Sequence, residues 1–207
     1  MPSSLLPALW TLPLAFILWF FTFAIPLGNF WLKLVLSASM LAAIGLKLSR
    51  GHWRTLFHFE LRYLWLGPLS AILLYGIFWL GKECSTFLFP FASKQISNVY
   101  FNKAQLDVRA IAFLLFFIMG PAEEIYWHGF VQRSLCQQLG SRKGLLLTAA
   151  IYSLVHIFAL NFILLVAAAV CGFFWGWLYQ REQSLIPVIL SHSIWDVLIF
   201  ILFPLSG

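Results

Sequence analysis

The first long apolar run of the chain, residues 5–25, reads LLPALWTLPLAFILWFFTFAI and contains no charged residue. A helix needs about 20 apolar residues to cross the hydrocarbon core of a bilayer, so this run has the length of a membrane span. It is too long for the apolar region of a secretory signal peptide, and no basic segment precedes it. We therefore interpret it as a first membrane helix.

The rest of the chain follows the same pattern. Of its 207 residues, 62% are hydrophobic and 10% are charged, whereas an ordinary soluble domain has roughly 45–50% apolar and about 25% charged residues. This composition excludes a soluble globular domain, a disordered chain and a nucleic-acid-binding module. We predict an all-α, polytopic membrane helix bundle of about seven transmembrane helices. The further apolar runs are residues 29–48, 63–81, 108–136, 144–161, 162–180 and 185–205.

The segments between these runs carry most of the charge. Residues 49–62 are basic and aromatic and are interpreted as an interfacial loop, and residues 84–105 are polar enough to hold a short interfacial helix. With a cytoplasmic N-terminus, eight basic residues lie inside and five outside, which favours that orientation. The eight are Lys47, Arg50, Arg54, Arg62, Arg133, Arg142, Lys143 and Arg181. We expect a multi-pass integral protein of the plasma membrane, with the lipid bilayer as one partner.

A stripe of small residues occurs in the sixth apolar run. Ala168, Gly172 and Gly176 recur at every fourth position and so share one face of a helix. Small residues let a neighbouring backbone approach closely in membrane bundles. The stripe predicts tight packing of this helix against another.

Six ionisable residues lie inside apolar runs, where a charge costs several kcal/mol and is functional by default. Glu124 and His128 are four residues apart and therefore lie on one helical face. Tyr152 and His156 have the same spacing, and so have His192 and Asp196. Each of three helices thus offers one polar face to a common interior. The six residues are Glu123, Glu124, His128, His156, His192 and Asp196.

The two glutamates are adjacent and therefore point about 100° apart around a helix. At most one of them can aim at a reacting group, and we expect the other to pair with His128 or with a neighbouring helix. Gly120-Pro121 precedes them, and a proline breaks the turn before it. We therefore expect the run at residues 108–136 to be kinked or split at this point, with both glutamates near the start of a new half-helix.

These residue types suit one kind of chemistry. A glutamate and a histidine that converge in a partly dry site can activate a water molecule, and a second histidine with a partner four residues away can stabilise an oxyanion. Together they provide for peptide hydrolysis without a covalent intermediate. No serine or cysteine lies in a recognisable nucleophile motif.

Three short motifs, in order, resemble those of the CAAX protease and bacteriocin-processing family. Residues 123–128 (EEIYWH) are similar to its first motif, usually E-E-x-x-x-R. Residues 152–156 (YSLVH) are similar to the second, F-x-x-x-H, and residues 192–196 (HSIWD) to the third, H-x-x-x-N or D. The resemblance covers about residues 110–205 and implies an intramembrane endopeptidase of glutamic type. It implies a division into N-terminal transmembrane helices and interfacial loops, residues 1–107, and a catalytic bundle of the last four helices, residues 108–207.

The resemblance also implies roles. Glu123 would be the general base, and His156 would position or activate the water. His192 and Asp196 would form or support the oxyanion site. Glu124 would be structural or would assist the base.

Two residues depart from the family pattern and are expected to support the site. His128 stands where the family usually has arginine, and histidine is neither permanently charged nor a two-pronged donor. Tyr152 replaces phenylalanine and adds a hydroxyl that needs a partner. Asp196 fits the pattern, but an ionised aspartate cannot donate to an oxyanion, so we expect it to orient His192. We interpret Trp127 and Trp195, at variable positions of the first and third motifs, as packing residues.

Two other classes of protein remain open. A zinc-dependent intramembrane metalloprotease would use Glu123 or Glu124 with His156 and His192 as ligands, although H-E-x-x-H is absent. A non-proteolytic membrane protein for bacteriocin immunity or proton-coupled transport is the other, since buried Glu–His sets serve as proton relays. The preferred interpretation needs no cofactor and no metal. Its substrate is a membrane-associated protein or peptide, with no nucleic acid as partner, and the oligomeric state is not predicted.

Overall fold

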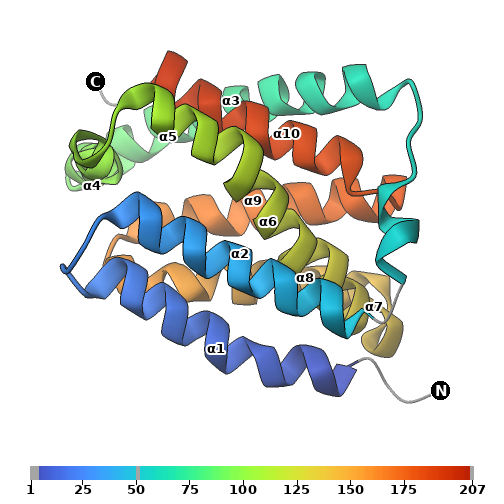
Figure 1. The fold of residues 1–207 in the computed structure, drawn as a ribbon. Helices are drawn as coiled ribbons and strands as arrows, with labels where there is room; N and C mark the ends of the chain where they lie inside the picture. The colour runs from blue at the N-terminus through green and yellow to red at the C-terminus, as the bar shows by residue number, and fades with distance from the viewer. Residues whose placement is uncertain (1–4, 50–51, 206–207) are drawn as a thin grey trace.

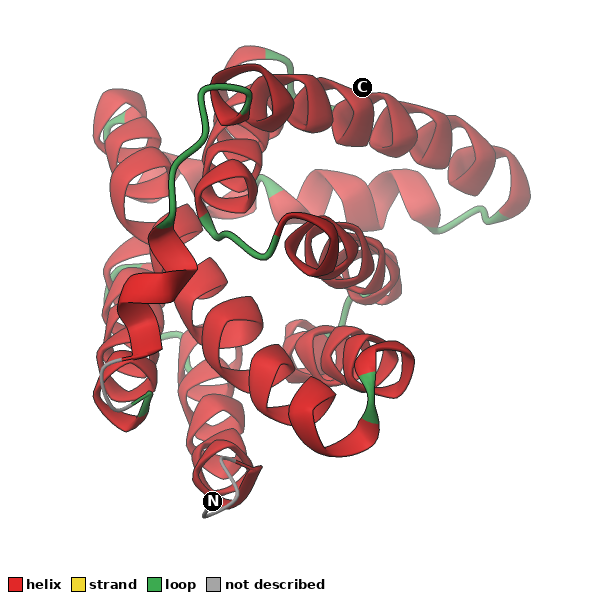
Figure 2. Cartoon of the chain, turned by 90° about the vertical axis from the view of Figure 1, so that its right-hand side faces the viewer, coloured by secondary structure: helices red, strands yellow, loops and turns green. Residues whose placement is uncertain are grey.

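A computed structural model of the chain describes residues 5–49 and 52–205. These residues are almost entirely helical and contain no β-strand, which confirms the all-α prediction (Figure 2). The long helices lie side by side in a bundle, with α1 starting at one end and the helix of the last apolar run finishing at the other (Figure 1). Arg50, counted above among the basic loop residues, lies outside the described ranges.

Five helices have the length and apolar composition to cross a membrane. The third of them ends at Leu88, well past the expected end at residue 81, so the polar segment begins inside this helix. The fourth is continued to Ala159 by a 3₁₀ turn. The five helices are α1 (Leu5–Ala24), α2 (Phe30–Leu48), α3 (Tyr63–Leu88), α8 (Ser141–Leu154) and α9 (Phe162–Glu182).

The count of seven spans is not confirmed, because the two remaining apolar runs are not long regular helices. The last run forms α10 (Ile186–Val197) and a π-helical segment, Leu198–Leu202, which together are shorter than the other spans. The run at residues 108–136 is divided among three short α-helices and two π-helical segments. Its α-helices are α5 (Val108–Leu114), α6 (Gly120–Glu124) and α7 (Arg133–Leu139), and its π-helical segments are Leu115–Met119 and Ile125–Gln132.

Of the kink or split expected at Gly120-Pro121, the split is wrong, because the helical backbone is continuous from residue 108 to residue 139. The π-helical segment before the proline provides the physical reason. The Gly120 N–H donates to the carbonyl of Leu115, five residues back, so the register has already shifted where Pro121 lacks a donor. Glu123 and Glu124 therefore lie within a continuous helical run and not at the start of a new helix.

The two ends of the bundle differ. One end, called here the α7 end, holds the start of α1, the 3₁₀-helix His52–Phe57 and α7 (Figure 1). The opposite end, called the α4 end, holds the connection between α1 and α2 and the short helix α4 (Ala92–Val99). A short helix was expected in this polar segment, and α4 occupies that place.

The small-residue stripe does mark a close helix contact. A Cβ atom at Gly172 would lie 2.9 Å from Cδ1 of Tyr152 and 3.2 Å from the Cα of Ala149, both on α8. One at Gly176 would lie 2.6 Å from Cδ1 of Leu145. The missing side chains therefore let α8 lie directly against α9.

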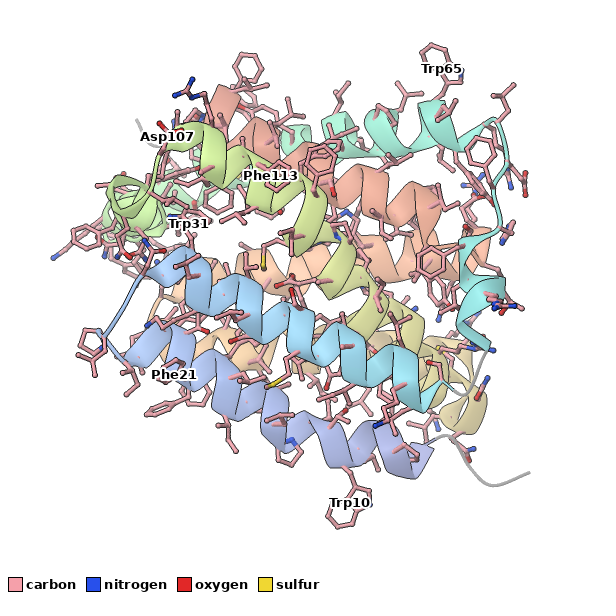
Figure 3. The ribbon with its side chains drawn as sticks, viewed as in Figure 1. Trp10, Phe21, Trp31, Trp65, Asp107 and Phe113 are labelled. Atoms are coloured by element: carbon pink, nitrogen blue, oxygen red, sulfur yellow. The ribbon has the colours of Figure 1, made fainter. Side chains whose placement is uncertain are left out.

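The outer surface of the bundle is apolar. Trp10 on α1 is 79% exposed and Trp65 on α3 is 72% exposed, and both point away from the bundle (Figure 3). Such a surface is costly in water but suits contact with lipid chains. Together with the five apolar helices, it identifies an integral membrane protein.

Candidate active site

The three motif helices bring all six buried ionisable residues to one region of the bundle. Glu123 and Glu124 come from α6, His128 from the π-helical segment that follows it, His156 from the 3₁₀ turn after α8, and His192 and Asp196 from α10. Each of the six side chains is at least nine-tenths buried. The arrangement is a cluster of carboxyl and imidazole groups inside an apolar casing.

Glu124 connects the first motif to the third. Its Oε1 lies 2.7 Å from Nδ1 of His192 on α10, and its Oε2 lies 3.6 Å from Nε2 of His128 on its own helical run. The expectation that one glutamate pairs with His128 or with a neighbouring helix describes Glu124, which bonds to His192 on α10 and lies near His128 without a hydrogen bond to it. Its side chain therefore binds two segments of the bundle together.

Glu123 points in a different direction, as adjacent helical residues must. Its Oε2 accepts a 2.6 Å hydrogen bond from the hydroxyl of Tyr152 on α8. The side chain of Glu123 makes no other hydrogen bond to a described residue, and it lines a large central cavity. Oε1 of Glu123 is therefore the carboxylate oxygen available to a molecule in that cavity.

The orientation of His156 is defined at both nitrogens of its ring. Nδ1 lies 2.8 Å from the backbone carbonyl of Tyr152, and a carbonyl oxygen only accepts, so Nδ1 carries a proton. Nε2 accepts a 3.3 Å hydrogen bond from Nε1 of Trp19 on α1. The imidazole is thus a neutral ring whose single acceptor position faces an indole.

His192 lies between two carboxyl groups. Glu124 is on its Nδ1 side, and Oδ2 of Asp196 is 3.5 Å from its Nε2. The indole of Trp175 on α9 stacks on the imidazole with ring centroids 3.7 Å apart and an angle of 17° between the planes. Three neighbours therefore define the plane and the rotation of this ring.

His128 is held by a buried amide. Its Nδ1 donates a 2.6 Å hydrogen bond to Oε1 of Gln132, and Nε2 of Gln132 donates to the carbonyl of Gly176 on α9 at 2.8 Å. His128 does not line the cavity, and its other nitrogen faces Glu124. Its contacts support Glu124 and connect the first motif to α9.

The central cavity has a volume of about 730 Å³ and extends from the buried cluster toward the α4 end. Glu123, Tyr152, His156, His192 and Asp196 line its inner part. Aromatic side chains line much of the remainder, among them Phe30, Trp31, Phe78, Phe89, Phe91 and Phe162. Two cationic side chains, Lys82 and Lys94, also line it. The cavity is mainly apolar, and its inner wall carries two carboxyl groups, those of Glu123 and Asp196, and the imidazoles of His156 and His192.

Sequence reasoning missed three residues of this site. Trp19, Trp175 and Gln132 lie outside the three motifs, and nothing in the sequence distinguishes the two tryptophans from the other tryptophans of the chain. Only Gln132 carried a usable signal, because a polar residue four positions after His128 shares its helical face.

The residues that the structure describes include no group of three or more His, Cys, Asp or Glu side chains placed to hold a metal ion. His156 uses Nδ1 for a backbone carbonyl and Nε2 for Trp19, and His192 has a carboxyl group on each side. The two histidines named for the zinc alternative are thus engaged with protein groups.

The apolar spans and the buried carboxylate–imidazole cluster define an integral membrane protein with a buried polar site. Residues 105–198 match a family model, Rce1-like, described as type II CAAX prenyl endopeptidase Rce1-like. The match confirms the resemblance that the three motifs indicated and supports a CAAX-type intramembrane endopeptidase. No curated protein and no solved structure matches the chain.

Proposed function

We propose that this protein is a glutamic-type intramembrane endopeptidase that hydrolyses a peptide bond of a membrane-associated protein or peptide. The observation that carries the proposal is the position of Glu123. It is a buried carboxylate with one oxygen held by Tyr152 and the other available to the central cavity. A general base must reach the proton that it removes, and Oε1 of Glu123 is so placed for a water molecule in this cavity.

The reaction needs one base and one donor to the developing oxyanion. Glu123 takes a proton from the water while the water oxygen bonds to the carbonyl carbon of the peptide. When the C–N bond breaks, the same proton passes from Glu123 to the leaving amine. His156 lies beside Tyr152 at the cavity wall and would accept the second O–H of the water, which orients it for attack.

We assign the oxyanion site to His192, which lines the cavity on α10. A protonated ring nitrogen of this residue would donate to the carbonyl oxygen as negative charge develops there. Asp196 and Glu124 flank the ring and would select its tautomer and orientation, as a carboxylate partner commonly does for histidine. Glu124 and His128 are then supporting residues.

The cavity also suits the class of substrate. Its apolar lining and volume have room for an apolar group attached to a peptide, and the prenyl group named in the family description is one such group. Lys82 and Lys94 would attract a carboxylate or another anionic group of the substrate. The site requires no metal, and we place the protein in the plasma membrane.

The test compares cells that carry the wild-type protein with cells that carry Glu123→Gln. New peptide termini in the membrane proteome, identified by mass spectrometry, are expected with the wild type and absent with Glu123→Gln or His156→Ala. Glu60→Gln is the matched control, because Glu60 is an exposed glutamate in the loop before α3, at the α7 end. Products that persist with Glu123→Gln at equal membrane levels would contradict the proposal.

One observation favours a second function enough to test it. His128, Glu124, His192 and Asp196 form a chain in which successive groups are no more than 3.6 Å apart. Such chains can relay protons. Proton flux into vesicles that contain the purified protein, lost with Glu124→Gln, would support transport and count against the endopeptidase.

A further inference from the structure

The helix α1 lies outside the segment that matches the family model, yet it reaches the buried cluster. Trp19 on α1 is fully buried and its indole N–H donates to Nε2 of His156 at 3.3 Å. The ring of Phe23, one turn further along, lies edge-on to the same imidazole with centroids 5.7 Å apart. Thr11 of α1 is hydrogen-bonded at 2.9 Å to the hydroxyl of Tyr126, two residues beyond the glutamates.

The hydrogen bond from Trp19 is made to Nε2 of His156, the ring atom that could otherwise accept a hydrogen bond from a water molecule. Because Nδ1–H is committed to the carbonyl of Tyr152, Nε2 carries the only lone pair of the ring. A neutral imidazole can accept a hydrogen bond only there. The indole therefore occupies the position that a water molecule would use, and it holds that position with a long and easily exchanged bond.

We propose that Trp19 is a positioning residue of the active site, contributed by α1 from outside the segment that matches the family model. The inference rests on the proposed function. Trp19 holds the imidazole of His156 in one rotation, with Nε2 unprotonated and directed at a bound donor. When the attacking water binds between Glu123 and His156, its O–H replaces the indole N–H as the donor to Nε2, and the ring does not have to turn.

The packing of Trp19 has to be separated from its hydrogen bond. Trp127 provides the comparison, because it is 1% exposed and contacts Trp19 edge-on at 6.3 Å. Among the described residues its Nε1 has no hydrogen-bond partner. Trp19→Phe and Trp127→Phe therefore remove the same atoms from the same cluster, and only the first removes a hydrogen bond.

The kinetic test measures kcat and KM for the full chain in proteoliposomes, with a peptide identified from the wild-type cleavage products. For Trp19→Phe we expect kcat to fall by about tenfold to a hundredfold, the range for a misplaced catalytic group, with KM changed less than about twofold. Trp127→Phe should keep kcat within about threefold of the wild type, since it removes no hydrogen bond. Equal losses in the two variants, or no loss in Trp19→Phe, would overturn the inference.

A second measurement does not depend on turnover. In the full chain labelled with ¹⁵N-histidine and placed in lipid bilayers, the Nε2 resonance of His156 is assigned by its disappearance in His156→Ala. It should move in Trp19→Phe, while the Nδ1–H resonance and the spectrum of Trp127→Phe stay unchanged. An unmoved Nε2 resonance overturns the inference. A wild-type protein that cleaves nothing overturns the proposed function instead, so the two failures are distinguishable.

Discussion

The hydroxyl of Tyr152 donates a 2.6 Å hydrogen bond to Oε2 of Glu123, across the contact between α8 and α6. Tyr152 stands where the CAAX protease family usually has phenylalanine, so this departure adds a direct contact to the proposed base. The bond occupies one carboxylate oxygen and leaves the other for the cavity. It also satisfies the hydroxyl, which would otherwise be buried without a partner.

Removing this hydroxyl should slow the reaction without abolishing it. In Tyr152→Phe, Glu123 loses a donor worth about 1.5–3 kcal/mol, and we expect kcat to fall by roughly tenfold because the carboxylate is less well oriented. Tyr126→Phe is the control, since that hydroxyl is also buried but bonds to Thr11. Wild-type kcat in Tyr152→Phe would show that the hydroxyl does not orient the base.

A methyl group at Gly172 should disturb both stability and the site. Its Cβ would lie 2.9 Å from Tyr152 and 3.2 Å from the backbone of Ala149, so α8 must move away from α9. We expect Gly172→Ala to lower the free energy of unfolding by about 1–3 kcal/mol, as overpacking does, measured by thermal unfolding in detergent. Gly76→Ala on α3 has open space around the new Cβ and should be neutral or stabilising. An unfolding temperature for Gly172→Ala equal to that of the wild type would contradict the close contact.

Cleavage should not depend on a metal ion. Incubation with a strong chelator, followed by removal of the chelator, is expected to leave kcat within about twofold, because a water activated by Glu123 needs no Lewis acid. Metal content is measured on the same sample by mass spectrometry. Activity that is lost and then restored by Zn²⁺ would instead support the metalloprotease alternative, with Glu123, His156 and His192 as the first ligands to test.

Two native cysteines can determine which side of the membrane the cavity faces. Cys84 on α3 is exposed and lies beside cavity residues at the α4 end, whereas Cys136 on α7 is partly exposed at the α7 end. The excess of basic residues at the α7 end favours a cytoplasmic location for that end. A membrane-impermeant maleimide should therefore label Cys84 in intact cells and Cys136 only in inverted vesicles. Cys84→Ser provides the control, and the reverse pattern would place the cavity opening on the cytoplasmic side.

The fold was predictable where it follows from the length of the apolar runs in the sequence. Runs near residues 5–25 and 29–48 became α1 and α2, since an uninterrupted apolar segment has few alternatives to a helix in a membrane. The run at residues 108–136 was not predictable in detail. Its two π-helical segments include the turn before Pro121, and a shift of hydrogen-bond register depends on neighbouring helices more than on the local sequence.

The sequence by itself determined which polar residues share a helical face, because side chains four residues apart are neighbours in any α-helix. The contacts Glu124–His128 and His192–Asp196 follow from that rule. Only the tertiary structure decided which faces meet. Tyr152 bonds to Glu123 although 29 positions separate them in the sequence. The separation is 68 positions for His192 and Glu124, and 137 for Trp19 and His156. Such contacts depend on how whole helices pack, with Gly172 and Gly176 setting the approach of α8 to α9, and no spacing within one helix encodes them.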